Sequence, residues 1–207
     1  MTDSELAVVI AAALRGWARH EPALRELDAA LGDGDLGITV RSGGLAAADA
    51  VEANAAGGLG AALRAAGQAF ATANPSTFAA LVGGGVLAGA RALPERAERT
   101  SEDALAFGRA VAQRIQERGK AEPGDKTLLD ALLPSLVVLE SADGAASRIT
   151  RSMAAVAHRG VEESTGWESR RGRAGWLGER SIGKPDAGAT AYALLLDELA
   201  VQFEARP

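Results

Sequence analysis

The sequence has no cysteine, only two histidines and 4% aromatic residues. Without cysteine, the chain cannot form a disulfide scaffold, a thiolate zinc site or a cysteine nucleophile. The two histidines, His20 and His158, cannot make a three-histidine metal site, and we expect both to be surface or core residues. A Walker-type GxxxxGK[ST] sequence is also absent, which excludes a P-loop nucleotide site.

The chain also lacks the signals of membrane and nucleic-acid binding. No apolar run approaches the roughly 20 residues that span a bilayer, and the first residues, MTDSELAVVI, lack the basic segment of a signal peptide. The 22 Lys and Arg residues against 27 Asp and Glu give a net charge of −5, which disfavours nucleic acid and anionic membranes as partners. We therefore expect a cytoplasmic protein.

Alanine dominates what is present, with 47 of the 207 residues. Because alanine favours helices and disfavours strands, the composition predicts an all-α fold, and the length fits a single domain over residues 1–207. Periodicity predicts eight long helices and one short one, with Ser4 and Ser101 capping the first and the sixth. The predicted ranges are 4–19, 22–30 (the short one), 38–56, 59–73, 77–92, 101–118, 126–140, 144–164 and 189–205.

The fifth predicted helix contains Gly83, Gly84, Gly85 and Gly89. A glycine inside a helix costs about 1 kcal/mol relative to alanine, so it needs a compensating reason. We favour close approach of a neighbouring helix over phosphate binding.

Asp28, Asp33 and Asp35 form an acidic cluster in the segment LDAALGDGDLG. Carboxylates within about 4–6 Å of one another repel by roughly 1 kcal/mol per pair even in water, and a hard divalent cation such as Mg²⁺ or Ca²⁺ removes that repulsion. The alternative is a solvated acidic turn. The following residues, Gly37-Ile38-Thr39, open a helix, and free N–H groups at a helix N-terminus bind phosphate oxygens.

The segment 165–188 has no clear helical pattern and is rich in glycine and basic residues. A loop of that length within a compact domain is usually functional or disordered, and its basic residues favour a functional loop that handles an anion. Trp176, in GRAGWLGER, either covers the site or anchors the loop.

Three separated motifs resemble a known family: LDAALGDGDLG, GKAEPGDKTLLDALLP (119–134) and GRAGWLGERSIGKPDAGAT (172–190). With them, nearly the whole chain resembles the L subunit, or ATP-binding domain, of dihydroxyacetone kinases. The resemblance implies a barrel of eight up-and-down amphipathic helices, with the nucleotide held in loops at one end.

The resemblance also implies roles for particular residues. It implies that Asp28, Asp33 and Asp35 hold two Mg²⁺ ions on the phosphates of ATP or ADP. Arg173 is the candidate catalytic residue that balances phosphate charge, and Lys126 and Arg180 are weaker candidates. The implied nucleotide contacts are Leu36, Gly37, Ile38, Thr39, Pro75, Ser76, Thr77, Gly119, Leu128, Arg173, Asp186, Ala187 and Gly188.

Two departures from the family pattern stand out. Family members commonly have histidine after the last aspartate, where this chain has Leu36, and a GGASG-type turn, where this chain has Pro75-Ser76-Thr77. Ser76 and Thr77 still offer hydroxyl groups and a helix N-terminus to a phosphate. These departures suggest a paralogue with a substrate other than dihydroxyacetone.

The function implied by the resemblance is a nucleotide-binding kinase subunit that passes a phosphoryl group to a short ketose held on a separate K subunit. Either ATP exchanges freely, or bound ADP is rephosphorylated by a phosphotransferase-system phosphocarrier. A homodimer is a further expected assembly. The alternatives are a regulatory paralogue that binds Mg-nucleotide without catalysis and a lipid-binding helical barrel.

Overall fold

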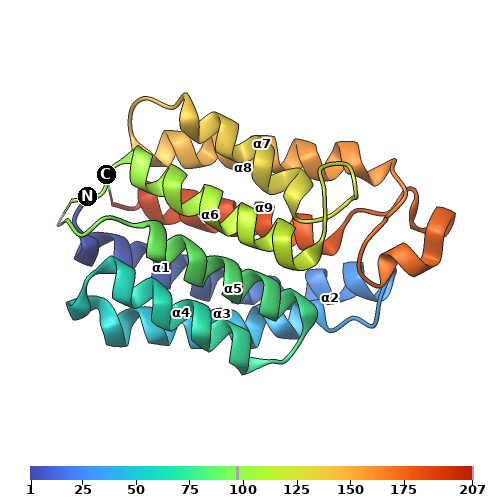
Figure 1. Ribbon diagram of the computed structural model, residues 1–207, viewed down its shortest axis with the longest axis horizontal. Coiled ribbons are helices and arrows are strands. Elements are labelled where there is room, and N and C mark those ends of the chain that lie inside the picture. The colour runs from blue at the N-terminus through green and yellow to red at the C-terminus, as the bar shows by residue number, and fades with distance from the viewer. Residues whose placement is uncertain (97, 207) are drawn as a thin grey trace.

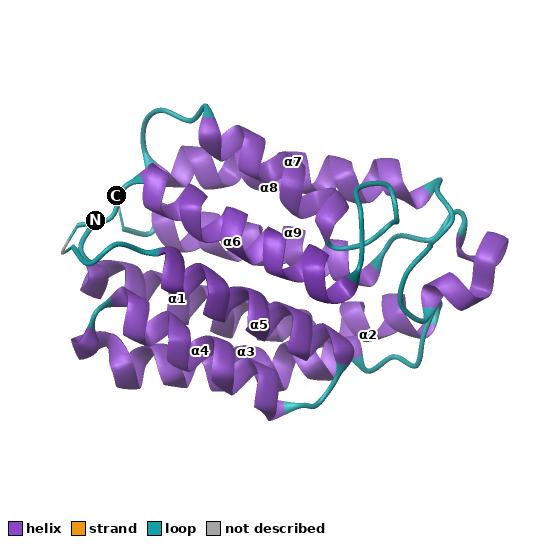
Figure 2. Cartoon of the chain, viewed as in Figure 1, coloured by secondary structure: helices purple, strands orange, loops and turns teal. Residues whose placement is uncertain are grey.

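The computed structural model describes residues 1–96 and 98–206, which form nine α-helices and three short 3₁₀ helices. The α-helices are α1 (Asp3–Trp17), α2 (Glu21–Ala29), α3 (Leu36–Asn54), α4 (Leu59–Ala73), α5 (Thr77–Ala92), α6 (Ser101–Gly119), α7 (Leu129–Glu140), α8 (Ala146–Thr165) and α9 (Ala187–Glu204). The 3₁₀ helices are η1 (Ala18–His20), η2 (Ala55–Gly57) and η3 (Ala174–Ser181). Over the described residues the prediction of an all-α fold is confirmed (Figure 2).

The eight long helices pack as a closed ring. Helix α1 packs against α3, each helix from α3 to α9 packs against the next, and α9 returns to α1, while the short α2 packs beside α3 (Figure 1). Neighbouring helices run in opposite directions, as the up-and-down prediction requires. None of the described helices is both long enough and apolar enough to cross a bilayer.

This alternation separates the two ends of the ring. One end is here called the loop end. It holds the segments 18–35 (which includes η1 and α2), 74–76, 120–128 and 166–186 (which includes η3), together with the first residues of α3, α5, α7 and α9. The chain termini lie at the other end (Figure 1).

The interior is filled by alanine and aliphatic side chains with few aromatic rings. Trp17 stacks on Phe70 with the ring centroids 5.8 Å apart, and the Trp17 indole N–H donates to the Ala191 carbonyl at 2.7 Å. Leu24, Val40, Ala48 and Ala191 are fully buried around them. Small side chains let the helices approach closely, so the ring needs little aromatic volume to fill its core.

The glycines of α5 face its two neighbours. A Cβ atom on Gly83 would lie 2.6 Å from the Gly67 carbonyl oxygen on α4, and one on Gly85 would lie 3.1 Å from a methyl group of Val111 on α6. The close-packing interpretation is confirmed at these two positions. Gly84 is different, because a Cβ atom there would have Nε of Arg114 as its nearest neighbour, 4.0 Å away.

Two predicted caps are wrong by one or two residues. Thr2, not Ser4, caps α1, and Thr100, not Ser101, caps α6. Each threonine forms a capping box with the acidic residue three positions later, so two main-chain N–H groups are satisfied reciprocally. The serines lie inside the helices, where that pairing is not available to them.

Six helices begin one to three residues away from the predicted start, namely α1, α2, α3, α7, α8 and α9. Helix α7 begins at Leu129 rather than 126, because Lys126 has a left-handed backbone with a φ of 61°. Helix α3 begins at Leu36 rather than 38. The segment 165–188, predicted without helix, includes the 3₁₀ helix η3.

We predict opposite effects for two adjacent glycines of α5. Gly83→Ala forces a methyl group against α4 and should lower the free energy of unfolding by about 1–3 kcal/mol. Gly84→Ala has room and should raise it by up to about 1 kcal/mol, because alanine is the better helix former. Urea denaturation measures both, and equal changes in the two variants would contradict the packing assigned to Gly83.

Candidate metal and phosphate site

Three aspartates converge at the turn between α2 and α3. Asp28 lies in the last turn of α2, and Asp33 and Asp35 lie in the turn that follows, where Gly34 has a φ of 76°. The main-chain N–H of Gly32 donates to the Asp28 carbonyl at 2.6 Å and closes the end of α2. One carboxylate oxygen from each aspartate lies within 4.8 Å of the other two. The structure therefore brings together the three residues that the sequence suggested as metal ligands.

Negative charge is concentrated at this aspartate triad (Asp28, Asp33 and Asp35). Burial raises the pKa of the Asp35 carboxyl and the Asp33 charge raises it further, while the Arg173 guanidinium opposes the rise. Nη1 of Arg173 contacts Oδ1 of Asp33 and lies 3.6 Å from Oδ2 of Asp35. A hard divalent cation such as Mg²⁺ fits a cluster of anionic oxygen atoms this close together. The contact with the Arg173 guanidinium is consistent with a site for positive charge.

The start of α3 lies directly against the triad. The main-chain N–H of Leu36 donates to Oδ2 of Asp28 at 3.2 Å, while the Leu36 side chain is 7% exposed and belongs to the core. A Cβ atom on Gly37 would collide with the main chain of α2 at Glu21 and Arg25, so only glycine lets the two helices meet here. Ile38, in the same turn, is exposed.

A side-chain network joins α3 to the turn before α5. Ser76 caps α5 by accepting from the Ala79 N–H at 3.1 Å. The buried Thr39 hydroxyl donates to Oγ of Ser76 at 3.2 Å and accepts from Nδ2 of Asn74 at 2.7 Å. Pro75 and Thr77, beside them, are exposed. The Pro75-Ser76-Thr77 segment therefore fixes the start of α5 beside the start of α3.

The starts of α5, α7 and α9 meet at Gly188. A Cβ atom there would lie 3.5 Å from the Phe78 ring of α5 and 3.8 Å from Cβ of Leu128. Asp186 caps α9 by accepting from the Ala189 N–H at 2.7 Å. Gly119, the last residue of α6, faces the side chain of Leu81 on α5.

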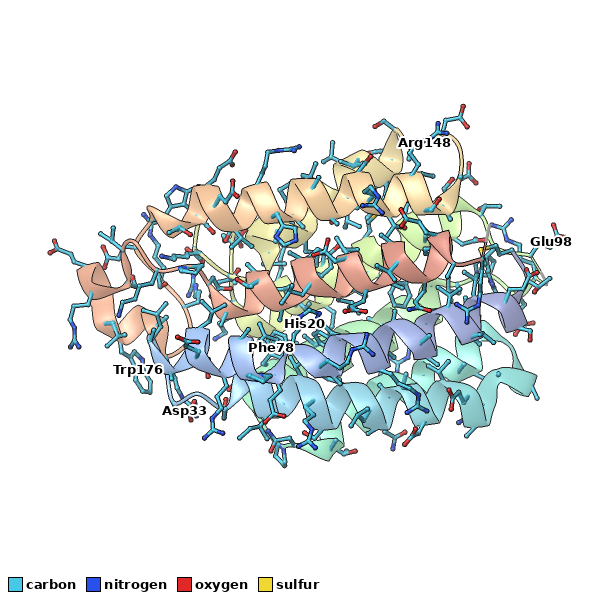
Figure 3. The ribbon with its side chains drawn as sticks, turned by 180° about the vertical axis from the view of Figure 1, so that it is seen from behind. His20, Asp33, Phe78, Glu98, Arg148 and Trp176 are labelled. Carbon is cyan, nitrogen blue, oxygen red and sulfur yellow. The ribbon has the colours of Figure 1, made fainter. Side chains whose placement is uncertain are left out.

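All the positions that the sequence suggested for the nucleotide thus lie at the loop end. Four of the described helices, α3, α5, α7 and α9, point their N-termini there, and each brings the positive end of a helix dipole. Figure 3 shows Asp33 and Trp176 toward this end, with Glu98 and Arg148 at the other. Helix N-termini attract phosphate, and the aspartate triad attracts the cation that phosphate carries.

Two of the weaker sequence suggestions are not supported. Lys126 is 1% exposed and its ammonium donates to main-chain carbonyl groups, so it is not available to balance phosphate charge. Trp176 is 86% exposed, which is incompatible with anchoring the loop by burial. His20 and His158 pair with Glu198 and Asp197 of α9, away from the triad.

Sequence reasoning missed Asn74, although it lies in the same unusual NPST turn. Its amide reaches Thr39 from 35 residues away, and a contact between such distant residues leaves no local signal.

The architecture is thus an all-α domain, a ring of antiparallel helices with an acidic triad and several helix N-termini at one end. The DAK2 domain matches residues 30–201 of this chain, which accordingly belongs to the DAK2 domain family.

Relatives of this chain differ in how much of their own length it matches. The L-erythrulose 1-kinase of Mycolicibacterium smegmatis is 39% identical over 193 residues, which cover 88% of this chain but 32% of that enzyme. The ADP-binding subunit DhaL of the PEP-dependent dihydroxyacetone kinase of Escherichia coli is 30% identical over 181 residues, with 86% of each chain covered.

The fold has also been seen in a solved structure. The dihydroxyacetone kinase of C. freundii, in complex with AMP-PNP and Mg²⁺, superimposes with a TM-score of 0.73 at 22% identity. The match covers 94% of this chain and 33% of that one, so this chain corresponds to about a third of that enzyme.

The carboxyl of Asp186 should make stability depend on pH. Burial raises its pKa from 3.8 to about 6, and the charges of Asp130 and Asp28 act in the same direction. The Ala189 N–H and the charge of Lys126 oppose the rise. Because the folded-state pKa is the higher one, its stabilising contribution is complete below the unfolded pKa and is lost as the pH rises through about 6.

We predict that Asp186→Asn stabilises the chain at neutral but not at acidic pH. Asparagine keeps an oxygen for the Ala189 N–H and removes the charge, so at neutral pH the free energy of unfolding should rise by about 1–3 kcal/mol. Urea denaturation across the range from about pH 4 to 8 should show this gain shrinking as the pH falls. Asp143→Asn, in an exposed turn at the other end, is the matched control, and a gain independent of pH would contradict the assignment.

Proposed function

We propose that residues 1–207 form one nucleotide-binding domain of a dihydroxyacetone-type kinase, which holds Mg-ATP or Mg-ADP at its loop end. The observation that carries this proposal is the approach of three carboxylate oxygens within 4.8 Å, beside the first turn of α3. Membership of the DAK2 domain family and the AMP-PNP and Mg²⁺ of the C. freundii enzyme support it.

In this proposal each part of the loop end has its own task. Asp28, Asp33 and Asp35 would hold two Mg²⁺ ions, which would neutralise phosphate charge during phosphoryl transfer. The first turn of α3 and the capped start of α5 direct N–H groups at the phosphates. The proposed contacts around the rest of the nucleotide are Gly119, Leu128, Asp186, Ala187 and Gly188.

Arg173 is the proposed catalytic residue. Its guanidinium is half exposed and reaches the aspartate triad from the segment 166–186. A guanidinium next to the phosphates stabilises the charge that develops as the phosphoryl group leaves. These contacts support a role for Arg173 in binding phosphate oxygens, whereas no ion pair joins Arg180 to the triad in the described residues.

The phosphoryl acceptor in this proposal is a short ketose on a separate K subunit or domain. Dihydroxyacetone and erythrulose are the candidate ketoses, because the related kinases carry these names. Two phosphate sources fit: exchanging ATP, or bound ADP rephosphorylated by a phosphotransferase-system phosphocarrier, as the PEP-dependent and PTS-dependent DhaL relatives suggest. ADP that stays bound through purification would favour the second source.

We predict that nucleotide binding requires both the metal and the triad. Calorimetric titration with ADP and with ATP should give micromolar or tighter binding in Mg²⁺. Asp33→Ala or excess EDTA should weaken it by about 100-fold, because a ligand of the metal or the metal itself is lost. Asp143→Ala, which removes a carboxylate at the other end, should bind as the wild type does. No binding by the wild type in any condition would overturn the proposal.

We predict that Arg173 acts in transfer more than in binding. With a K subunit and ketose supplied, Arg173→Ala should lower kcat by about 10²–10³-fold, with a smaller effect on nucleotide affinity. Arg180→Ala, from the same loop, is the control and should retain most of the activity. Equal losses in both variants would indicate a general effect of loop charge. Tight Mg-nucleotide binding by the wild type without transfer to either ketose would favour a regulatory paralogue.

A further inference from the structure

Lys126 is a buried charged residue with no role in the proposed chemistry. Its side chain is 1% exposed, and Nζ donates to the carbonyl groups of Thr165, Trp167 and Ser181 at 3.1, 3.0 and 2.8 Å. All three acceptors are main-chain oxygens. Burial lowers the pKa of the ammonium, and the charge of Asp186 partly offsets the fall.

The three acceptors belong to both ends of one loop, residues 165–183. Thr165 and Trp167 lie where the chain leaves α8, and Ser181 lies at the end of η3. The same ends are joined directly, because the Gly183 N–H donates to the Thr165 carbonyl at 2.8 Å. The ammonium of Lys126 therefore joins the two ends at the base of the loop, in addition to this main-chain bond, and donates to the Trp167 carbonyl between them.

The residue before Lys126 holds the middle of the same loop. Oδ2 of Asp125 accepts from Nε of Arg171 at 2.7 Å, and the Asp125 carbonyl accepts from the Arg170 N–H at 3.0 Å. Arg173, two residues further on, is the group that reaches the aspartate triad. One segment between α6 and α7 thus fixes the loop that carries Arg173.

The backbone of this segment has a left-handed conformation at Lys126. Lys126 has a φ of 61°, an unfavourable conformation for a residue with a side chain. The main chain is held there by Asp130, whose carboxylate accepts from the N–H groups of Gly124 at 2.6 Å and Thr127 at 2.7 Å. With this backbone conformation the lysine side chain is buried beneath the loop, where Nζ reaches the three carbonyl groups.

We propose that Lys126 is a positioning residue for the nucleotide site: its ammonium closes the base of the 165–183 loop, and the closed loop presents Arg173 to the aspartate triad. The role assigned to the nucleotide rests on the proposed function, whereas the closure of the loop does not. Lys126 acts through the loop and touches no part of the triad.

The test compares two lysines with the same backbone conformation. Lys126→Met removes the ammonium but keeps the length of the side chain, and Lys120→Met is the control, because Lys120 also has a left-handed backbone, with a φ of 51°, but is exposed. Limited trypsin digestion with mass spectrometry measures cleavage after the loop residues Arg170, Arg171, Arg173 and Arg180. Cleavage should be at least about tenfold faster in Lys126→Met and unchanged in Lys120→Met, because digestion follows the opening of the loop.

A second variant distinguishes opening of the loop from general unfolding of the chain. Lys126→Gly adopts the same backbone without strain, and n-butylammonium should restore slow cleavage by replacing the missing ammonium, whereas tetramethylammonium at the same ionic strength should not. Equal rescue by the two salts, or a normal cleavage rate in Lys126→Met, would overturn the inference.

The nucleotide measurement separates this inference from the proposed function. In Lys126→Met the Kd for Mg-ADP should rise by about tenfold, or kcat should fall by as much, since Arg173 is no longer held in place. An opened loop with unchanged Kd and kcat would overturn the positioning role. Failure of the wild type to bind nucleotide would instead overturn the proposed function, and the cleavage rates alone would then decide whether Lys126 closes the loop.

Discussion

The repulsion among Asp28, Asp33 and Asp35 is the constraint on which the rest of the loop end depends. Carboxylate oxygens within 4.8 Å of one another repel, and the repulsion falls with compensating charge. The chain supplies part of it through the first N–H of α3 and through the guanidinium of Arg173. The N–H of Leu36 is local to the triad, whereas Arg173 lies far away in the sequence, so its contact with Asp33 exists only when the loop end is folded.

The ring meets this requirement through small residues and alternating direction. Glycine and alanine let α4, α5 and α6 approach closely, and α2 can cross α3 only at Gly37. Because each helix reverses the direction of the one before it, α3, α5, α7 and α9 all start at the same end. The composition that makes the chain helical is thus also the one that gathers helix N-termini around the triad.

The sequence predicted those parts that depend on local pattern. The ranges 59–73 and 77–92 agree with α4 and α5, and the motif around the triad marked residues that the structure brings together. The start of α7 and the position of Lys126 were not predictable in this way. The start of α7 follows from the left-handed backbone of Lys126, which Asp130 holds through Gly124 and Thr127. The burial of the Lys126 side chain depends on carbonyl groups 39 to 55 positions away, and neither feature leaves a periodicity in the sequence.

The most direct test of the account is the position of the metal. Crystals of the chain grown with ADP and Mn²⁺ in place of Mg²⁺ would give an anomalous signal at each ion. The account predicts a peak within coordination distance of the carboxylates of Asp28, Asp33 and Asp35, with the ADP phosphates on its other side. A nucleotide bound elsewhere, or manganese bound away from the three carboxylates, would contradict it.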